Sequence, residues 1–446
     1  MGSVLNIAAF DPDSRDVDDI IQDGKIIYLD YNASTPHAPQ VIDVISHTLK
    51  KKWFNPSSIY FSDNKEIVNT SHEVIEDARE QVADMIGSSP KDIVFTSGGT
   101  EANNMILQTA VKYFNEHCFP DMSEIYNDKP ILPHFITSNL EHDSVKEVLE
   151  HFVKTNTAEV TFVGASRQTG CIQPEDIIKK IRPNTIMVSV MAANNITGII
   201  QPIAKICESV RAVEREHGET QRILVHTDAA QILGKVETSV KEMDVDYMTI
   251  VGHKFYGPRI GAVFARDLGT QAHLYSLLKG GCQEHGYRPG TENTAMIVGL
   301  GMACTLVKHN IAEYEHYMEE IRNYLEEKLE EAFGADNVKF NGRIPGVPRL
   351  PNTCNVSILD GHLEGRKILS HVKLIKASVG AACHSSDKNS VNSVLLASGI
   401  PEDVAKSSIR LSVGRETSLN DIAIAVEDLK QAVSLAKSKD AAADTD

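Results

Sequence analysis

The stretch DIVFTSGGTEANN, residues 92–104, passes from a strand pattern through two glycines into a helix pattern. Its first part, DIVFTS, is short and apolar, as is typical of a buried strand. Gly98 and Gly99 follow, and Thr100 opens the helical part. A strand that turns directly into a helix predicts an α/β fold with a largely parallel sheet.

Six further segments have the same strand character and are separated by helical patterns such as SHEVIEDAREQVADMIG. They are HFITS (134–138), EVTFVGA (159–165), TIMVSVMA (185–192), RILVHTD (222–228), YMTIVG (247–252) and GAVFARD (261–267). The alternation predicts a mostly parallel seven-stranded sheet with helices on both faces. Ligands of such sheets bind at the carboxyl ends of the strands.

The pattern changes at about residue 296. The sequence from there predicts a long amphipathic helix with one break. Strand-like TCNVSIL, IKASVG and SIRLSVG follow, and a last helix starts at Ser418, with Asp421 completing its cap. We therefore predict a large domain over 26–295 and a smaller α+β domain over 296–436. The acidic segment 1–25 and the tail 437–446 are expected to be disordered.

The composition of the 446 residues narrows the range of partners. The formal net charge of −17 argues against nucleic acid or an anionic membrane as the main partner. No apolar run approaches the roughly 18 residues of a membrane span. Seven cysteines without CxxC spacing indicate reduced thiols and no metal site. Since the acidic N-terminus is unlike a transit peptide, we expect the cytosol or the nucleus.

Two strand ends carry residues suited to binding charged groups. Gly99 and Thr100 form either a phosphate site at a helix N-terminus or an ordinary turn with a threonine cap. Asp228 ends a buried strand, and Gln231 follows three residues later. A buried carboxylate needs a partner, which is either a cationic ring nitrogen or a structural salt bridge.

Three other strand ends carry reactive or polar side chains. Lys254, beside His253, either forms a Schiff base with an aldehyde or leaves the sheet as a surface lysine. His142 follows another strand and is either structural or stacked on a ring. Asn195 lies in AANNITG, a sequence that by itself predicts only a turn.

Taken together, a phosphate cradle, a carboxylate for a ring nitrogen, a lysine for an aldehyde and a stacking histidine describe a pyridoxal 5′-phosphate site. Further motifs are YLDYNASTP (28–36), NPSSIY (55–60), VGHKFYGPRIGA (251–262), GYRPGTENT (286–294) and SSIRLSVGR (407–415). With them, residues 26–436 resemble the cysteine desulfurase (NifS-like) family of class-V aminotransferase-type enzymes. The resemblance implies the pyridoxal-phosphate transferase fold of type I.

The resemblance also assigns roles within the cofactor site. Lys254 matches the lysine that holds the cofactor covalently and moves the Cα proton. His142 matches a histidine that stacks on the ring and assists proton transfer, and Asp228 matches the partner of the ring nitrogen. The remaining cofactor contacts are matched by Gln231 and Asn195 near the ring hydroxyl and by Gly99, Thr100 and His253 at the phosphate.

Three assignments concern the substrate and the subunits. Arg410 matches the arginine for the substrate carboxylate, and Asn195 matches a second substrate contact. Thr291 matches a phosphate contact donated by a neighbouring subunit, which implies a homodimer. Cys383 matches a catalytic cysteine on a loop of small and polar residues, whose mobility would let the thiol reach the substrate.

The implied activity is conversion of the amino acid L-selenocysteine to L-alanine, with selenium released as selenide or passed to an acceptor protein. The alternative is a cysteine desulfurase that leaves a persulfide on Cys383. A third interpretation, from another class, is a non-enzymatic thiol or metal carrier that uses Cys383 and His384. Four residues depart from the pattern of the family: Ile196, Val251, Cys282 and His285.

Overall fold

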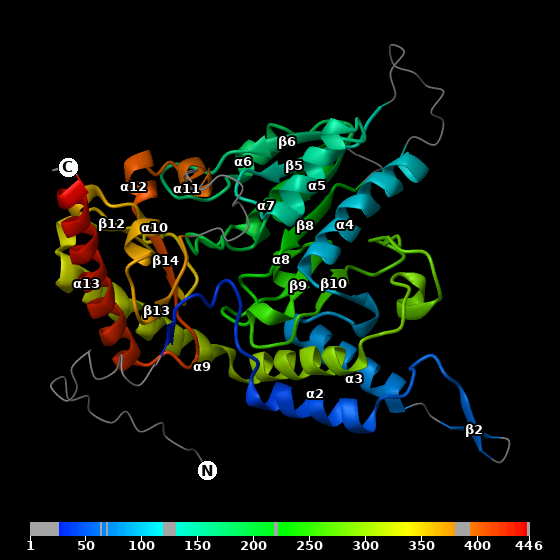
Figure 1. Cartoon of the computed structure of the whole chain (residues 1–446). Coiled ribbons are helices and arrows are strands. Elements are labelled where there is room, and N and C mark those ends of the chain that lie inside the picture. Colours follow the sequence, from blue (N-terminus) through cyan, green and yellow to red (C-terminus); the bar gives the residue numbers. More distant parts are fainter. Residues whose placement is uncertain are drawn as a thin grey trace.

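The computed structural model describes residues 26–62, 65–67, 70–118, 131–217, 222–379 and 393–443 (Figure 1). All seven predicted strands lie in one sheet, in the order β4-β10-β9-β8-β7-β5-β6. Only β10 runs antiparallel to its neighbours, so the prediction of a mostly parallel sheet is confirmed. The bounds are β4 Ile93–Thr96, β5 His134–Ser138, β6 Glu159–Val163, β7 Thr185–Ser189, β8 Leu224–Asp228, β9 Tyr247–Val251 and β10 Gly261–Ala265.

Both faces of this sheet are packed. In β4, Ile93 and Phe95 belong to one apolar cluster and Val94 belongs to another, as the two-residue period of a strand requires. Helices follow most strands and cover the sheet. Their bounds are α3 Thr70–Ile86, α4 Gly99–Tyr113, α5 Asp143–Lys154, α6 Pro174–Ile178, α7 Ile203–His217 and α8 Val240–Met243. Short helical turns are η1 Pro90–Asp92, η2 Phe114–Cys118, η3 Gly252–Lys254 and η4 Gln283–Gly286.

A second core is built around a three-stranded antiparallel sheet, β11-β12-β14. Ile27 and Leu29 pack in this core, although the sequence division placed them with the large domain. The reason is that β1 pairs in parallel with β13. The elements are β1 Ile27–Tyr28, β11 Val338–Phe340, β12 Thr353–Ile358, β13 Ile375–Lys376, β14 Ser408–Ser412, η5 Ala335–Asn337, η6 Asp360–His362, α10 Gly365–Leu369, α11 Ser393–Ala397, α12 Glu402–Lys406 and α13 Leu419–Ala443.

One helix, α9 (Thr294–Phe333), joins the two cores (Figure 1). It is continuous, so the predicted break is absent from it. Leu300 and Val307 pack in the first core, whereas Leu325 and Leu329 pack in the second. By length and composition alone α9 could cross a membrane, but these packed side chains account for its apolar character. Helix α2 (Pro39–Lys51) lies against it.

Two expectations about chain segments need correction. Helix α13 continues to Ala443, so residues 437–443 are not the disordered tail that was predicted. The run of alanine and lysine there has high helix propensity, and Lys437 pairs with Asp360. The hairpin of β2 (Tyr60–Ser62) and β3 (Lys65–Ile67) was not anticipated. The N-terminal segment 1–25 and residues 444–446 lie outside the described residues.

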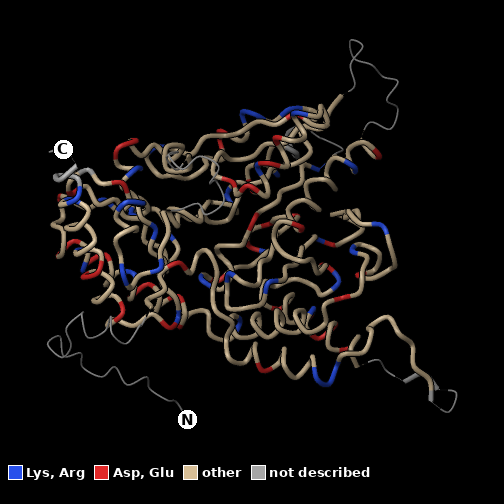
Figure 2. The backbone as a smooth tube through the Cα atoms, viewed as in Figure 1, with Lys and Arg blue, Asp and Glu red and all other residues tan. Residues whose placement is uncertain are grey.

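Charged residues of both signs are interspersed along the described backbone (Figure 2).

Candidate active site

The predicted site residues follow the carboxyl ends of the central strands. Thr100 comes after β4, His142 after β5, Asp228 ends β8, and Lys254 comes after β9. Strands β8 and β9 are direct neighbours. Because parallel strands end at one edge of a sheet, the fold gathers these side chains along one edge.

The turn after β4 is a helix N-terminus with no side-chain cap. Gly98 is the N-cap residue of α4, and its helix begins at Gly99. A Cβ on Gly99 would lie 2.7 Å from the Val251 side chain, so only glycine fits without displacement. Backbone amides at such a terminus, together with the helix dipole, favour a bound anion. Thr100 is exposed beside them.

Asp228 is held by a buried amide that the sequence analysis did not identify. Asn103 Nδ2 donates to Asp228 Oδ2 at 2.9 Å, and the Ala230 backbone amide donates to Asp228 Oδ1, also at 2.9 Å. Thr249 Oγ1 in turn donates to Asn103 Oδ1 at 2.6 Å. The carboxylate is 7% exposed and accepts only neutral donors among the described residues. It is therefore available to a cationic group.

His142 is the N-cap of α5, and its Nδ1 atom is an acceptor. The Ser144 backbone amide donates to Nδ1 at 3.1 Å, and Ser144 Oγ lies 2.9 Å from the same atom. Asn103 Nδ2 also donates to Ser144 Oγ at 2.8 Å. These donors place the ring proton on Nε2 and connect His142 to Asp228 through Asn103.

Lys254 points back to the N-terminal segment. Its Nζ atom donates to the backbone carbonyls of Asn32 at 2.8 Å and Ala33 at 2.9 Å. Gln231 Nε2 donates to the same Asn32 carbonyl at 3.0 Å. The structure thus brings Lys254 and Gln231 together, as predicted.

His253 lies in the short turn η3 after β9, directly before Lys254. Burial, with the nearby cations Lys254 and Arg259, lowers the pKa of His253 to about 4, so its ring is neutral at physiological pH. Its Nδ1 atom lies 3.2 Å from Ser34 Oγ.

Arg410 and Asn195 meet on the side of the site that faces the second core. Arg410 is 3% exposed. Its Nη1 donates to the Asn195 carbonyl at 2.9 Å, and its Nη2 donates to Asp30 Oδ1 at 2.5 Å. Its Nε is buried without a hydrogen-bond partner in the described structure. This guanidinium therefore retains a donor for a carboxylate ligand.

Cys383 lies outside the described residues. The chain on either side of its segment is anchored beside the Arg410 pair. Before it, Ser378 pairs with Arg410 through backbone hydrogen bonds, the shorter of 2.7 Å. After it, Leu395 packs against Ile196, which neighbours Asn195. The apolar Leu395 gives a physical reason for the departure at Ile196.

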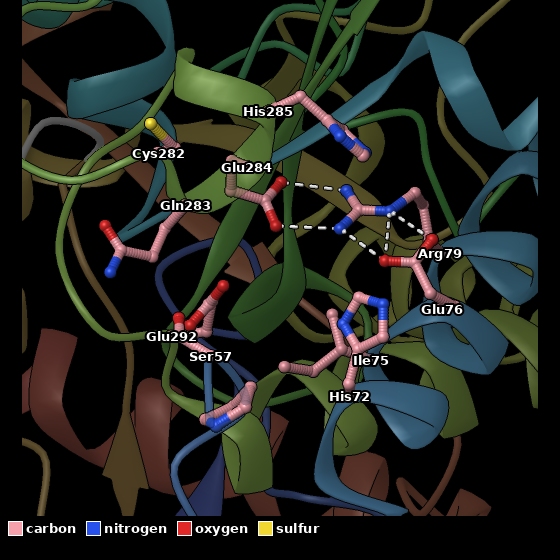
Figure 3. Close-up of a pocket in the computed structure, with 11 residues that line it drawn as sticks. Ser57, His72, Ile75, Glu76, Arg79, Cys282, Gln283, Glu284, His285 and Glu292 are labelled. Atoms are coloured by element: carbon pink, nitrogen blue, oxygen red, sulfur yellow. Dashed lines mark hydrogen bonds and ion pairs between the residues drawn. The ribbon is translucent and has the colours of Figure 1, made fainter. Parts of the chain in front are cut away.

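Thr291 is exposed, and within the described part of the chain no hydrogen bond or ion pair joins it to the residues of its own cofactor edge. Its loop is fixed by the buried ion pair of Glu284 and Arg79, shown in Figure 3, with N–O distances of 2.7 and 2.8 Å. Glu284 also accepts from the Phe95 amide of β4 at 2.7 Å. Because β4 leads into the turn at Gly99, one carboxylate braces both segments.

The cavity in Figure 3 has a volume of about 370 Å³ and lies beside this ion pair. Cys282 and His285, two of the departures, line it together with Ser57. Glu284 and His285 have positive φ angles of 50° and 54°, which non-glycine residues rarely adopt. No group of three metal-binding side chains occurs within the described ranges.

These residues fit pyridoxal 5′-phosphate. Each chemical part of that cofactor has a counterpart here: an amine at Lys254, a carboxylate at Asp228 and an uncapped helix N-terminus at Gly99. The sequence analysis did not identify Asn103, although the sequence carries a signal for it. Its helix neighbours Ala102 and Met105 are apolar, and a polar side chain buried among apolar residues needs a partner.

Comparisons with known proteins agree with this arrangement. The family model for aminotransferase class-V matches residues 27–424. A selenocysteine lyase from Xenopus laevis is 51% identical over 92% of this chain and 95% of its own length. The cysteine desulfurase IscS from Dictyoglomus turgidum is 35% identical over 91% of this chain and 94% of its own length. A solved NifS-like protein has a TM-score of 0.77 at 27% identity and covers 92% of this chain and all of its own.

Proposed function

This chain belongs to the aminotransferase class-V family, and from that membership we propose that it is a selenocysteine lyase. The enzyme uses pyridoxal 5′-phosphate to convert L-selenocysteine to L-alanine and release selenium. The observation that carries the proposal is the difference in identity over nearly the same length: 51% to a selenocysteine lyase and 35% to a cysteine desulfurase.

The cofactor would be held along the strand edge. When bound, it supplies an aldehyde that bonds to an amine and a ring that accepts the electron pair released at the substrate Cα. Lys254 would provide the amine, and Asp228 would pair with the ring nitrogen. Gln231 and Asn195 would contact the ring hydroxyl, and Gly99, Thr100 and His253 would bind the phosphate.

Proton transfer is assigned to Lys254 and His142. The Lys254 amine removes the proton from the substrate Cα and later returns a proton to the product. His142, with its proton on Nε2, would stack on the ring and assist this transfer. The Asn103 amide supports both His142 and Asp228, which keeps the two groups in a fixed relative position.

The substrate is oriented by its carboxylate. Arg410 offers its unpaired Nε to this group, and the Asn195 carbonyl keeps the guanidinium in place at 2.9 Å. Asp30 holds the other end of the guanidinium.

Cys383 is assigned to selenium release. Ser378 precedes it by five residues. A fully extended chain of this length spans at most about 18 Å. Because Ser378 is hydrogen-bonded to Arg410, no more than this length of chain separates Cys383 from the residue assigned to the substrate carboxylate. Release as selenide requires two reducing equivalents, which an external thiol can supply, and an acceptor protein is proposed as the recipient.

The desulfurase alternative differs mainly in its dependence on Cys383. Sulfur leaves less readily than selenium because a thiol is less acidic than a selenol, so attack by the Cys383 thiolate contributes more to its release. We expect Cys383→Ala to lose less alanine formation on selenocysteine than on cysteine. Equal losses on both substrates would instead favour a desulfurase.

A homodimer is proposed on two observations. Thr291 is exposed on a braced loop, as a donated residue would be. Next to that loop, Trp53, Ile59 and Phe61 are 70%, 66% and 67% exposed, a large apolar surface for a monomer. Ser57 of this segment and Cys282 of the loop line the same cavity (Figure 3).

Subunit mixing tests the dimer. Lys254→Ala and Thr291→Arg chains should each be inactive alone. In a mixed dimer, however, one site combines an intact Lys254 with the neighbour's intact Thr291. Mixing equal amounts should then restore about a quarter of wild-type activity. No recovery after verified subunit exchange would argue against a donated Thr291.

The compartment is proposed to be the cytosol. The cysteines at 118, 171, 207, 282, 304 and 354 are free thiols, which suits a reducing environment. Imaging of the full chain with a C-terminal fluorescent tag would test this, and a mitochondrial signal would contradict it.

A further inference from the structure

A second buried lysine lies next to the proposed cofactor site. Lys235 is 3% exposed. Its Nζ atom donates to Gln231 Oε1 at 2.7 Å and to Asn32 Oδ1 at 3.1 Å. It forms no ion pair with the carboxylates of the described residues. A lysine is rarely buried with neutral partners only, because desolvation of its charge is costly.

Both partners of Lys235 belong to the site already described. Gln231 Nε2 donates to the Asn32 backbone carbonyl at 3.0 Å, and Lys254 Nζ donates to the same carbonyl at 2.8 Å. Asn32 therefore receives one lysine on its side chain and the other on its backbone. Each of the two amines contacts Asn32, but they contact different oxygens.

The amine contacts the oxygens of two amide side chains. Its N–H groups donate to both of them, and the oxygen of Asn32 also accepts from Asn352 Nδ2 at 3.0 Å. The nitrogen of Gln231 faces Asn32. The nitrogen of Asn32 faces Thr353 Oγ1 at 2.8 Å. Without Lys235, the oxygen of Gln231 would lose its described partner, and the amide would be held only through its nitrogen.

The two charged groups that shift the pKa of Lys235 are both positive. Burial lowers the pKa of Lys235 well below its ordinary value, and the neighbouring cations Lys254 and Arg410 act in the same direction. This repulsion is mutual, so a proton on Lys235 makes a proton on Lys254 less favourable.

We infer that Lys235 is a positioning residue of the active site: its amine holds the oxygen of Gln231, whose nitrogen contacts the same Asn32 carbonyl that accepts from Lys254. The inference rests on the proposed function in one respect, namely that Gln231 and Lys254 contact pyridoxal 5′-phosphate. It assigns Lys235 no contact with the substrate or the cofactor.

The test uses the visible absorbance of the holoenzyme without substrate, recorded against pH. In Lys235→Met the midpoint of the absorbance change should shift by about one pH unit, because the groups around the cofactor and Lys254 reorient. Lys235→Gln keeps a donor, so its shift should be smaller. It also serves as the test protein if the methionine variant does not fold.

Arg211→Met is the matched control. Arg211 is also buried, but it pairs with Asp246 and the Ile223 carbonyl near the starts of β8 and β9, away from the cofactor edge. It should lower the melting temperature and leave the absorbance midpoint unchanged. If Lys235→Met and Lys235→Gln behave like this control, Lys235 is only structural and the inference is overturned.

The two proposals fail in different ways. A holoenzyme with a normal absorbance titration that does not act on selenocysteine would refute the lyase and leave the Lys235 inference standing. Normal lyase activity with an unshifted midpoint in both Lys235 variants would refute only the inference.

Discussion

Asn103 Nδ2 lies 2.9 Å from Asp228 Oδ2, so a buried amide on α4 holds the carboxylate at the end of β8. The same nitrogen donates to Ser144, which lies 2.9 Å from the His142 ring. One side chain therefore connects the proposed partner of the ring nitrogen with the proposed stacking histidine.

Replacing Asn103 with alanine should weaken cofactor binding. The change removes a donor from Asp228 and from Ser144, and each lost buried hydrogen bond costs about 1–3 kcal/mol. We expect the dissociation constant of pyridoxal 5′-phosphate to rise at least about tenfold, as measured by fluorescence titration of the apoprotein. Gln108→Ala, at an exposed position of the same helix, is the control. Equal affinities for both variants would rule out this role of Asn103.

Replacing Lys254 with alanine should abolish turnover and covalent attachment of the cofactor. The amine is the only assigned group that bonds to the aldehyde. Mass spectrometry after borohydride reduction measures the attachment, and Lys179→Ala, an exposed lysine on the surface, should retain it. A Lys254→Ala protein that still carries reducible cofactor at this site would contradict the assignment.

Stability should depend on pH through Glu141. Burial raises the pKa of this carboxyl from its ordinary value of 4.5 to about 8, and the nearby Asp228 charge acts in the same direction. Between these values the folded state binds more protons than the unfolded state, so the free energy of unfolding falls as pH rises.

Glu141→Gln should remove this dependence, because its amide stays neutral at every pH. Relative to wild type, the variant should gain up to about 4 kcal/mol between pH 5 and pH 8. Urea unfolding at several pH values measures this difference. Parallel stability curves for the two proteins would show that Glu141 does not titrate in this range.

Replacing Glu284 with glutamine should destabilise the loop that carries Thr291. The change leaves a buried arginine without its main partner, which costs about 3 kcal/mol or more. Glu76→Gln is the matched control, because Glu76 pairs with the same Arg79 from a side chain that is 39% exposed. It should cost less than about 1 kcal/mol. Thermal melts that rank the two variants in the opposite order would refute the bracing role of Glu284.

Much of the fold could be predicted because its strands are short, apolar and separated by helices. The ends of the seven strands lie within a few residues of their predicted positions, and His142, Asp228 and Lys254 follow those ends. A sheet edge is a local consequence of sequence pattern, so the residues at this edge can be found without tertiary information.

The supporting residues could not be predicted, because their roles depend on distant partners. The role of Lys235 depends on its contact with Asn32, which lies about 200 residues earlier in the sequence. Glu284 likewise pairs with Arg79 across the large domain. The continuation of α13 to Ala443 was missed because the tail is polar, although its alanines favour a helix.

The most direct test of the central claim is alanine formation by the purified wild-type holoenzyme with L-selenocysteine and with L-cysteine, under reducing conditions at equal concentrations. If the protein is a selenocysteine lyase, kcat/KM should be clearly higher for selenocysteine, and selenide should appear in step with alanine. A higher kcat/KM for cysteine would contradict the lyase assignment and favour a cysteine desulfurase.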